Sequence, residues 1–211
     1  MLRRLANHYG APQGLDAEVR RVDQPDHRNI TISKGDKDKL LAAASASIRC
    51  YILLCSDLAI RSGTAVKIAP QNFDKEKNRL NFTTKKGKSM SLPVTSELRS
   101  MFLAAEVRCP PERPYVSFFS TKGTCGRESA YDNFRRLKRR LGIDDRITPH
   151  DLRRTTAIAV LETTGDIREV QAALGHKRLT TTVQYLGGSL SSVSNDVLEL
   201  AKLHPLTERP Q

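Results

Sequence analysis

The segment from Thr148 to Leu186 constrains this chain most, because it combines helix-start signals with reactive side chains. Thr148 and Pro149 suit the N-cap and the first position of a helix. His150 and Arg153 then fall three residues apart on one face of the first turn. The same face continues as an apolar stripe, and burying unpaired positive charge is costly. We therefore predict that this helix begins beside a cleft that binds an anion, with phosphate as the natural ligand.

Two shorter helices are predicted to follow. The first begins after Asp166 and ends at Gly175, which suits a C-terminal cap, and His176 comes directly after it. The second spans 179–186, and its apolar residues share one face. Tyr185 lies roughly 120° from the centre of that face by helical geometry. We therefore expect the Tyr185 hydroxyl to be available for chemistry rather than to fill the core.

Three short motifs in this segment resemble those of the tyrosine recombinases, the phage-integrase family. HDLRRT at His150–Thr155, LGH at Leu174–His176, and a tyrosine nine residues beyond that histidine match the family's motifs in order. One such motif alone is weak evidence, whereas three in register are specific. The alternative is a helical domain on which these side chains only cover the surface. The resemblance implies a mostly α fold with a small antiparallel β-sheet.

Earlier in the chain, the patterns predict helices over 36–46, 47–59, 96–107 and 129–141. Alternating apolar residues on both sides of a lysine-rich turn predict a β-hairpin after the second helix. By position in the family's pattern, Arg61 matches the first catalytic arginine, and Lys85, eight residues before Pro93, matches the catalytic lysine. The family usually has an acidic residue where Thr64 stands here, and a surface arginine at a helix end is the alternative for Arg61.

The resemblance thus implies six catalytic residues: Arg61, Lys85, His150, Arg153, His176 and Tyr185. The two arginines would hold the non-bridging oxygens of a DNA phosphodiester, and His150 would act on the tyrosine proton. Lys85 would protonate the leaving 5′-hydroxyl, while His176 would hydrogen-bond the phosphoryl oxygen. Tyr185 would form a 3′-phosphotyrosine bond. This chemistry implies no metal, no ATP and no other cofactor.

Positive charge is the main signal from composition. Lys and Arg number 35 against 23 Asp and Glu, a formal net charge of +12, which favours a polyanionic partner. Aromatic residues make up 5% of the chain and Trp is absent, so double-stranded DNA fits better than stacked single strands. We predict contacts to the DNA backbone from the hairpin and from the helix over 129–141, with a solvated charged surface as the alternative. These predicted contacts are Lys86, Lys88, Arg135, Arg136, Lys138 and Arg139.

The chain is expected to have three parts. Residues 1–34 resemble the end of an N-terminal domain and its linker, or an ordinary disordered N-terminus, and 35–188 form the catalytic domain. Residues 189–211 form a tail whose helix docks on a neighbouring protomer or on its own domain. There is no long apolar run or signal sequence, so we expect a cytoplasmic protein that does not enter a membrane. Its four cysteines, which lack metal-ligand spacing, are expected to be free thiols.

Together these features predict a site-specific recombinase or integrase of a phage or mobile element. Such a protein would cleave and rejoin duplex DNA and would self-associate on it, as a tetramer in the synaptic complex. Two alternatives share parts of this description. One is DNA relaxation of the type IB topoisomerase kind, which uses the same chemistry, and the other is a non-catalytic DNA-binding relative.

Overall fold

The computed structural model describes residues 30–84, 87–121 and 123–186. The predictions for the N-terminal segment before residue 30, for Lys85 and Lys86, and for the tail helix lie outside these ranges.

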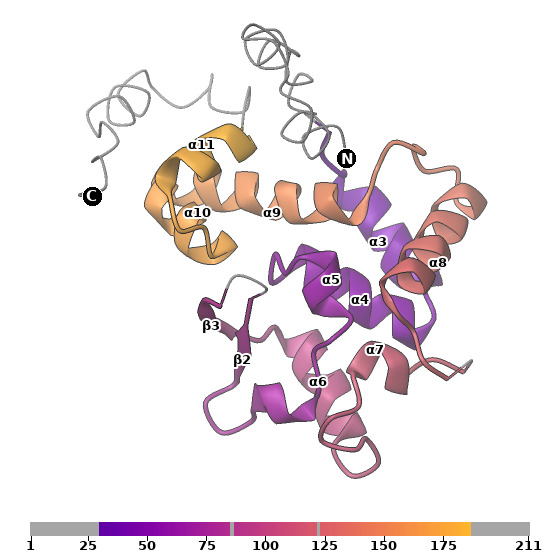
Figure 1. Cartoon of the computed structure of the whole chain (residues 1–211). Helices are drawn as coiled ribbons and strands as arrows, with labels where there is room; N and C mark the ends of the chain where they lie inside the picture. Colours follow the sequence, from indigo (N-terminus) through magenta and orange to yellow (C-terminus); the bar gives the residue numbers. More distant parts are fainter. Residues whose placement is uncertain (1–29, 85–86, 122, 187–211) are drawn as a thin grey trace, which may run out of the picture.

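The described chain consists of helices around one small sheet (Figure 1). The helices are α3 (Lys34–Ala43), α4 (Ala46–Ser56), α5 (Ser62–Ala65), α6 (Ser96–Ala105), α7 (Tyr115–Phe118), α8 (Arg127–Arg140), α9 (Pro149–Thr164), α10 (Ile167–Leu174) and α11 (Leu179–Leu186), with a 3₁₀ turn at Pro70–Asn72. The strands are β1 (Phe73–Asp74), β2 (Arg79–Thr83) and β3 (Ser89–Pro93), which form an antiparallel sheet in the order β1-β2-β3. The predicted class, mostly α with a small antiparallel sheet, is confirmed.

Helix α4 forms the centre of the main core. Nine of its eleven residues are buried, including Cys50, Tyr51 and Cys55. A helix that is apolar all round must be covered on every side, and α3, α6, α7, α8 and α9 all contact it. Burial raises the pKa of the Cys50 and Cys55 thiols, so both stay protonated and inert at neutral pH. All four cysteines are free.

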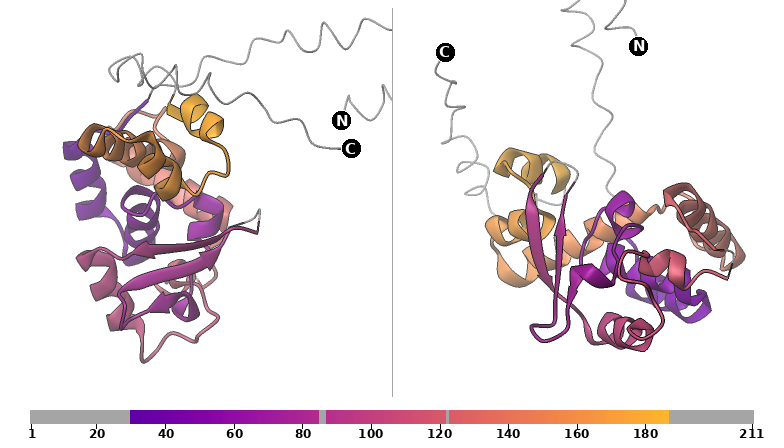
Figure 2. Two further views of the ribbon diagram at one scale, coloured as in Figure 1. Left: turned by 90° about the vertical axis from the view of Figure 1, so that its left-hand side faces the viewer. Right: turned by 60° about the horizontal axis from the view of Figure 1, so that its bottom comes forward.

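Helix α9 connects the main core to a second, smaller cluster. Leu152, near its start, packs in the main core, whereas Ala157 and Leu161 pack against residues of α10 and α11. Figure 2 shows α10 and α11 lying against the later turns of α9. Ala59, just after α4, is also buried in the second cluster. The start of α9 therefore lies where the two clusters meet, and the candidate site is built there.

The β2–β3 hairpin approaches the second cluster at one point. Leu80 pairs with Leu92 and Phe82 pairs with Met90, as the alternating pattern predicts. Gly175, the C-cap of α10, has φ +63°, and a Cβ built there would lie 2.7 Å from Met90 Sδ. The left-handed conformation favours glycine, and the missing Cβ leaves room for the Met90 side chain, so Gly175 lets the hairpin lie against α10.

Two elements differ from the sequence-based expectation. Residues 109–126 are rich in Pro and Gly, and the sequence predicts a loop there with a short buried segment at 115–119; Tyr115 is buried as expected, but Tyr115–Phe118 form the one-turn helix α7. Strand β1 is only two residues long, too short to give a detectable alternation. Across the described ranges, every helix is too short or too polar to cross a membrane.

Candidate active site

The first turn of α9 is fixed by a capping box. The backbone N–H and the hydroxyl of Thr148 both donate to the Asp151 carboxylate, at 2.8 and 2.7 Å. Pro149 occupies the first helical position, where a missing N–H costs nothing. This turn carries His150 and leads into Arg153, so the backbone beneath both side chains is held firmly.

Arg153 ties α9 to two other segments. Its guanidinium donates to the backbone carbonyl of Ala59 and, at 2.8 Å, to that of Leu174 at the end of α10. The residue is only 4% exposed, so it does not face an open cleft as predicted; the two carbonyls make its burial tolerable. Burial, with the nearby charge of Arg61, lowers the pKa of Arg153 to about 10, so it remains a cation at neutral pH. A guanidinium has five N–H donors, and these contacts leave capacity for an anion.

Arg61 stands at the N-cap of α5, after an unusual turn. Ala59 has φ +48°, a conformation that costs a non-glycine residue about 1–2 kcal/mol. The strain is held in place by burial of Ala59 and by the Arg153 contact to its carbonyl. The turn brings the exposed Arg61 side chain to the rim of a cavity of about 510 Å³.

That cavity is strongly cationic. It lies between the α5 end of the main core, the hairpin and the α10–α11 connection, and Thr64 and Thr84 also line it. Its basic lining residues are Arg61, Lys88, His176, Lys177 and Arg178. Lys177 and Arg178 were not singled out from the sequence, because nothing local shows that they join residues from the hairpin and α5. The concentration of positive charge suits a phosphate or a phosphodiester.

His176 is oriented by a buried threonine. Its Nδ1 lies 3.0 Å from Thr182 Oγ1, in a pair where Thr182 is fully buried and His176 is 6% exposed. Burial, followed by the charges of Arg153 and Arg61, lowers the pKa of His176 to about 4. The imidazole is therefore neutral at pH 7. A neutral ring held through Nδ1 presents Nε2 as its second hydrogen-bonding position.

Tyr185 lies between the two histidines. Its ring centroid is 5.0 Å from that of His150 and 5.6 Å from that of His176, nearly perpendicular to both. Burial raises the pKa of Tyr185 to about 12, against the opposing effect of Arg153 and Arg154, so the phenol is protonated at neutral pH. Its hydroxyl donates to the His150 backbone carbonyl at 3.3 Å, not to the imidazole.

His150 is set to receive a proton. Partial burial of its ring, followed by the charge of Arg153, lowers its pKa below the ordinary value, which favours the neutral imidazole at pH 7. Transfer from the Tyr185 hydroxyl then needs a small side-chain rotation or a bridging water, as is common before substrate binds. Of the six residues singled out, the structure brings together five, Arg61, His150, Arg153, His176 and Tyr185; Lys85 lies outside the described ranges.

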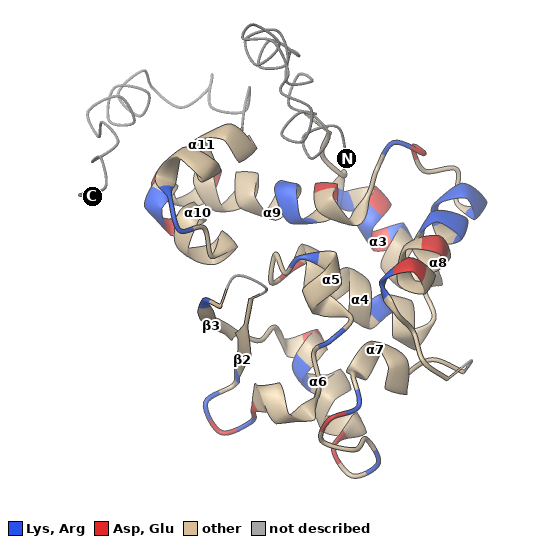
Figure 3. Ribbon diagram, in the orientation of Figure 1, with Lys and Arg blue, Asp and Glu red and all other residues tan. Residues whose placement is uncertain are grey.

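Helix α8 is not uniformly basic: its acidic residues lie in its first half and most of its cations in its second half (Figure 3). Arg135 pairs with Asp132 at 3.2 Å, and Arg139 pairs with Asp145 at 3.1 Å. Arg136 donates to Asn133 at 2.6 Å. All three arginines are exposed, and their contact with DNA stays a prediction.

The prediction that Lys138 contacts DNA is wrong. Lys138 is 1% exposed, and its Nζ donates to the backbone carbonyls of Asp144 and Asp145, at 3.2 and 2.9 Å. The turn after α8 folds back over this side chain, so the ammonium stabilises the turn instead of meeting a phosphate. Lys88, by contrast, lines the cationic cavity.

One more arginine belongs to this site. Arg154 donates to the carbonyls of Tyr185 and Leu186, at 2.6 and 2.5 Å, and its guanidinium carbon lies 6.0 Å from the Tyr185 ring. Arg154 was not predicted as part of the site, because its partners are more than 30 residues away in sequence. Within the described ranges, no group of three His, Cys, Asp or Glu side chains is placed to hold a metal ion.

This mostly helical domain, with its three-stranded sheet beside the last helices, has the fold of tyrosine recombinase catalytic domains. Residues 31–189 match the phage integrase family, and the chain belongs to that family. The predicted family and fold are thereby confirmed.

Among curated relatives, tyrosine recombinase XerC of Rhizobium meliloti (strain 1021) is 29% identical over 152 residues, covering 70% of this chain and 46% of the relative. Tyrosine recombinase XerC of Chlamydia pneumoniae is 31% identical over 142 residues, covering 65% of this chain and 46% of the relative. The chain therefore spans about half the length of the curated relatives it matches.

Two solved structures illustrate the likeness of fold. The XerA recombinase superposes with a TM-score of 0.64 at 23% identity, covering 90% of this chain and 67% of that one. A lambda integrase dimer bound to a COC′ core site superposes with a TM-score of 0.67 at 18% identity, covering 88% and 68%.

Proposed function

We propose that this chain is the catalytic domain of a site-specific DNA recombinase or integrase, which cleaves and rejoins duplex DNA through a 3′-phosphotyrosine intermediate. The observation that carries the proposal is the placement of Tyr185 between His150 and His176, beside a cationic cavity with Arg61 at its rim. Membership of the phage integrase family supports the same chemistry. The proposal assigns the catalytic domain to 35–188.

In the proposed reaction, the Tyr185 oxygen attacks the scissile phosphorus and the bond to the 5′-oxygen breaks. The phenolic proton passes to the neutral His150, because a phenol with a raised pKa is a poor nucleophile until it is deprotonated. Arg61 and Arg153 offset the charge on the non-bridging oxygens, where the forked guanidinium is favoured. His176 hydrogen-bonds a phosphoryl oxygen, and Arg153, which is anchored on two carbonyls, offers its remaining N–H donors to the phosphate.

Lys85 is proposed to protonate the leaving 5′-oxygen, on the basis of its position in the family's pattern. A 5′-bridging phosphorothiolate tests this role, because its sulfur leaves without a proton. Cleavage lost in Lys85→Ala should return with that substrate. Rescue of Lys86→Ala or Lys88→Ala instead would assign the acid to that lysine. One phosphoester forms for each that breaks, so the reaction needs no energy source.

Duplex DNA is the proposed partner, and protomers are proposed to assemble on paired sites as a tetramer. Support comes from matched structures whose proteins are bound to DNA, including the XerH recombinase on a palindromic difH substrate and the lambda integrase dimer on a core site. Docking of the tail helix on a neighbouring protomer stays a prediction, since the tail lies outside the described ranges.

The decisive experiment needs no known target sequence. The protein is incubated with a pool of nicked duplexes whose sequence around the nick is randomised, and SDS-resistant protein–DNA adducts are isolated. An adduct linked through Tyr185 supports the proposal, and sequencing of the trapped DNA gives the site preference. Tyr185→Phe should bind the pool as the parent does and form no adduct; an adduct in this variant would assign the nucleophile elsewhere. A second assay distinguishes the two activities. Strand exchange between two of the recovered DNA sites indicates recombination, whereas relaxation of supercoiled DNA alone indicates topoisomerase activity.

A further inference from the structure

Two neighbouring arginines on α9 fasten that helix to different places. Arg153 reaches Ala59 and the end of α10, whereas Arg154 reaches the end of α11. Arg154 is 4% exposed, and its two terminal nitrogens donate to the carbonyls of Tyr185 and Leu186. The second arginine therefore contacts the main chain of the residue that carries the nucleophilic hydroxyl.

The hydrogen bonds from Arg154 to the last carbonyls of α11 are favourable for two physical reasons. The last carbonyls of a helix have no intrahelical donor and lie at the negative end of the helix dipole. A guanidinium offers parallel charged donors, which give short and strong hydrogen bonds. Helix α11 has only eight residues, so it is too short to be stable alone and its position depends on tertiary contacts. Arg154 supplies such a contact at Tyr185 itself.

The contact also fixes an orientation. The Tyr185 hydroxyl bonds the backbone carbonyl of His150, and its own carbonyl bonds Arg154, so both ends of the residue are held by α9. The Arg154 guanidinium carbon lies 6.0 Å from the ring centroid, at the edge of the range for a cation–π contact. A rotation or slide of α11 would break these contacts together.

Resting on the proposed function, we propose that Arg154 is a positioning residue that holds the backbone of Tyr185 so that its hydroxyl meets the scissile phosphate. It acts through Tyr185 and does not touch the DNA. Displacing a nucleophile by about 1 Å can cost roughly 10² in rate. Loss of Arg154 should therefore slow covalent attack by roughly 10-fold to 10²-fold while duplex affinity stays within two-fold.

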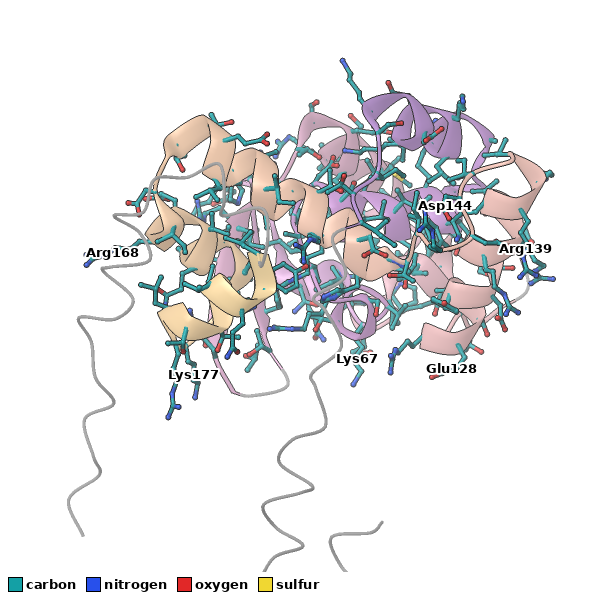
Figure 4. The ribbon with its side chains drawn as sticks, turned by 90° about the horizontal axis from the view of Figure 1, so that it is seen from above. Lys67, Glu128, Arg139, Asp144, Arg168 and Lys177 are labelled. Atoms are coloured by element: carbon teal, nitrogen blue, oxygen red, sulfur yellow. The ribbon has the colours of Figure 1, made fainter. Side chains whose placement is uncertain are left out.

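The test uses the full chain and three variants. Arg154→Met keeps the aliphatic stem and removes the donors and the charge, and Arg154→Lys keeps the charge and a single donor group. Arg168→Met is the matched control, because Arg168 is exposed on α10 and projects outward, away from the site (Figure 4). Proteins labelled with 3-fluorotyrosine report the surroundings of each tyrosine by ¹⁹F NMR, and Tyr185→Phe identifies the Tyr185 signal. Adduct formation and duplex affinity are measured with the nicked pool.

We expect the Tyr185 signal to shift or broaden in Arg154→Met, to stay near the parent position in Arg154→Lys, and to be unchanged in Arg168→Met. Adduct formation should fall in the same order. A parent-like Tyr185 signal together with an adduct rate within two-fold of the parent in Arg154→Met would overturn the proposal. If Arg154→Met does not fold, Arg154→Lys decides: a Tyr185 signal and an adduct rate that both stay near those of the parent support the role, whereas loss of the adduct with an unchanged Tyr185 signal contradicts it. If the parent itself forms no adduct, the proposed function fails, while the NMR signal still tests the contact.

Discussion

The ring of Tyr185 stands 5.0 Å from the ring of His150 and almost perpendicular to it, while its hydroxyl bonds the His150 main chain. The nucleophile and its proposed base thus come from α11 and from the first turn of α9, and each helps to hold the other. Because α11 packs against α9, the two residues are held in fixed relative positions and the pair is largely preorganised.

This pair predicts a specific pH dependence. Although the His150 side chain is exposed, its neighbours partly desolvate the ring, and with the charge of Arg153 they disfavour the imidazolium form, so the pKa lies below the ordinary value of about 6.5. The neutral ring is the proton acceptor, so adduct formation at subsaturating DNA should rise with pH through the acidic range. The midpoint of that rise should lie below pH 6.5. The variant His150→Gln should form the adduct roughly 10²–10⁴-fold more slowly, which is the usual size of a general-base contribution. The rise of its rate with pH in the acidic range should also disappear. If the rise of the adduct rate with pH were centred well above pH 6.5, His150 would not be the proton acceptor.

The second prediction concerns Thr182. Its hydroxyl is expected to donate to His176 Nδ1, which leaves the proton on Nε2 toward the cavity. Thr182→Val keeps the shape but leaves that buried nitrogen unsatisfied, so unfolding free energy should drop by about 1–3 kcal/mol, and Thr182→Ser should recover most of it. Nitrogen-15 NMR of the His176 ring reads the tautomer directly. A proton on Nδ1 in the parent would reverse the proposed direction of the bond.

Local signals explain why so much of the site could be predicted. The cap at Thr148, the αL glycine at Gly175 and the alternating hairpin are each set by a few neighbouring residues. The motif spacing then identified His150 and Tyr185, which do lie together. Local patterns carry this information because helix caps and strand alternation depend on short-range sterics and hydrogen bonds.

What could not be predicted depends on distant partners. Arg153 is buried because Ala59, 94 residues earlier, turns its carbonyl toward it. Lys138 is buried because the following turn folds back, although its sequence neighbourhood is that of an exposed basic helix. The same holds for Arg154, whose partners are the last carbonyls of α11. Burial of a charged side chain is decided by tertiary acceptors, which periodicity does not reveal.

The third prediction tests how the hairpin is seated. Gly175→Ala imposes the left-handed conformation on a residue with a Cβ, which costs about 1–2 kcal/mol, and also brings that Cβ against Met90. The steric part can be relieved because Met90 is flexible, so adding Met90→Ala should recover that part of the loss and not the backbone part. Chemical unfolding of the two single variants and the double variant measures the coupling. If the changes in unfolding free energy of the two single variants simply add in the double variant, Met90 makes room for the new Cβ at no cost in free energy.

The last prediction concerns which cations meet the DNA backbone. Lys177 lines the cationic cavity beside His176, whereas Arg139 is paired with Asp145 near the far end of α8. Figure 4 shows the two side chains projecting from different sides of the molecule. The sequence predicts a phosphate contact from Arg139, and the structure leads us to expect a stronger one from Lys177.

Each phosphate contact releases counterions and adds about 0.9 to the slope of log affinity against log salt. Lys177→Gln should therefore reduce that slope by about one contact, and Arg139→Gln by less than half as much. Fluorescence anisotropy with a labelled duplex over a range of salt concentrations measures both slopes. Because each variant removes one positive charge, a general loss of electrostatic attraction would lower the two slopes equally. Equal reductions would therefore contradict a specific contact from Lys177, and a larger effect from Arg139 would move the DNA-contacting surface from the cavity to α8.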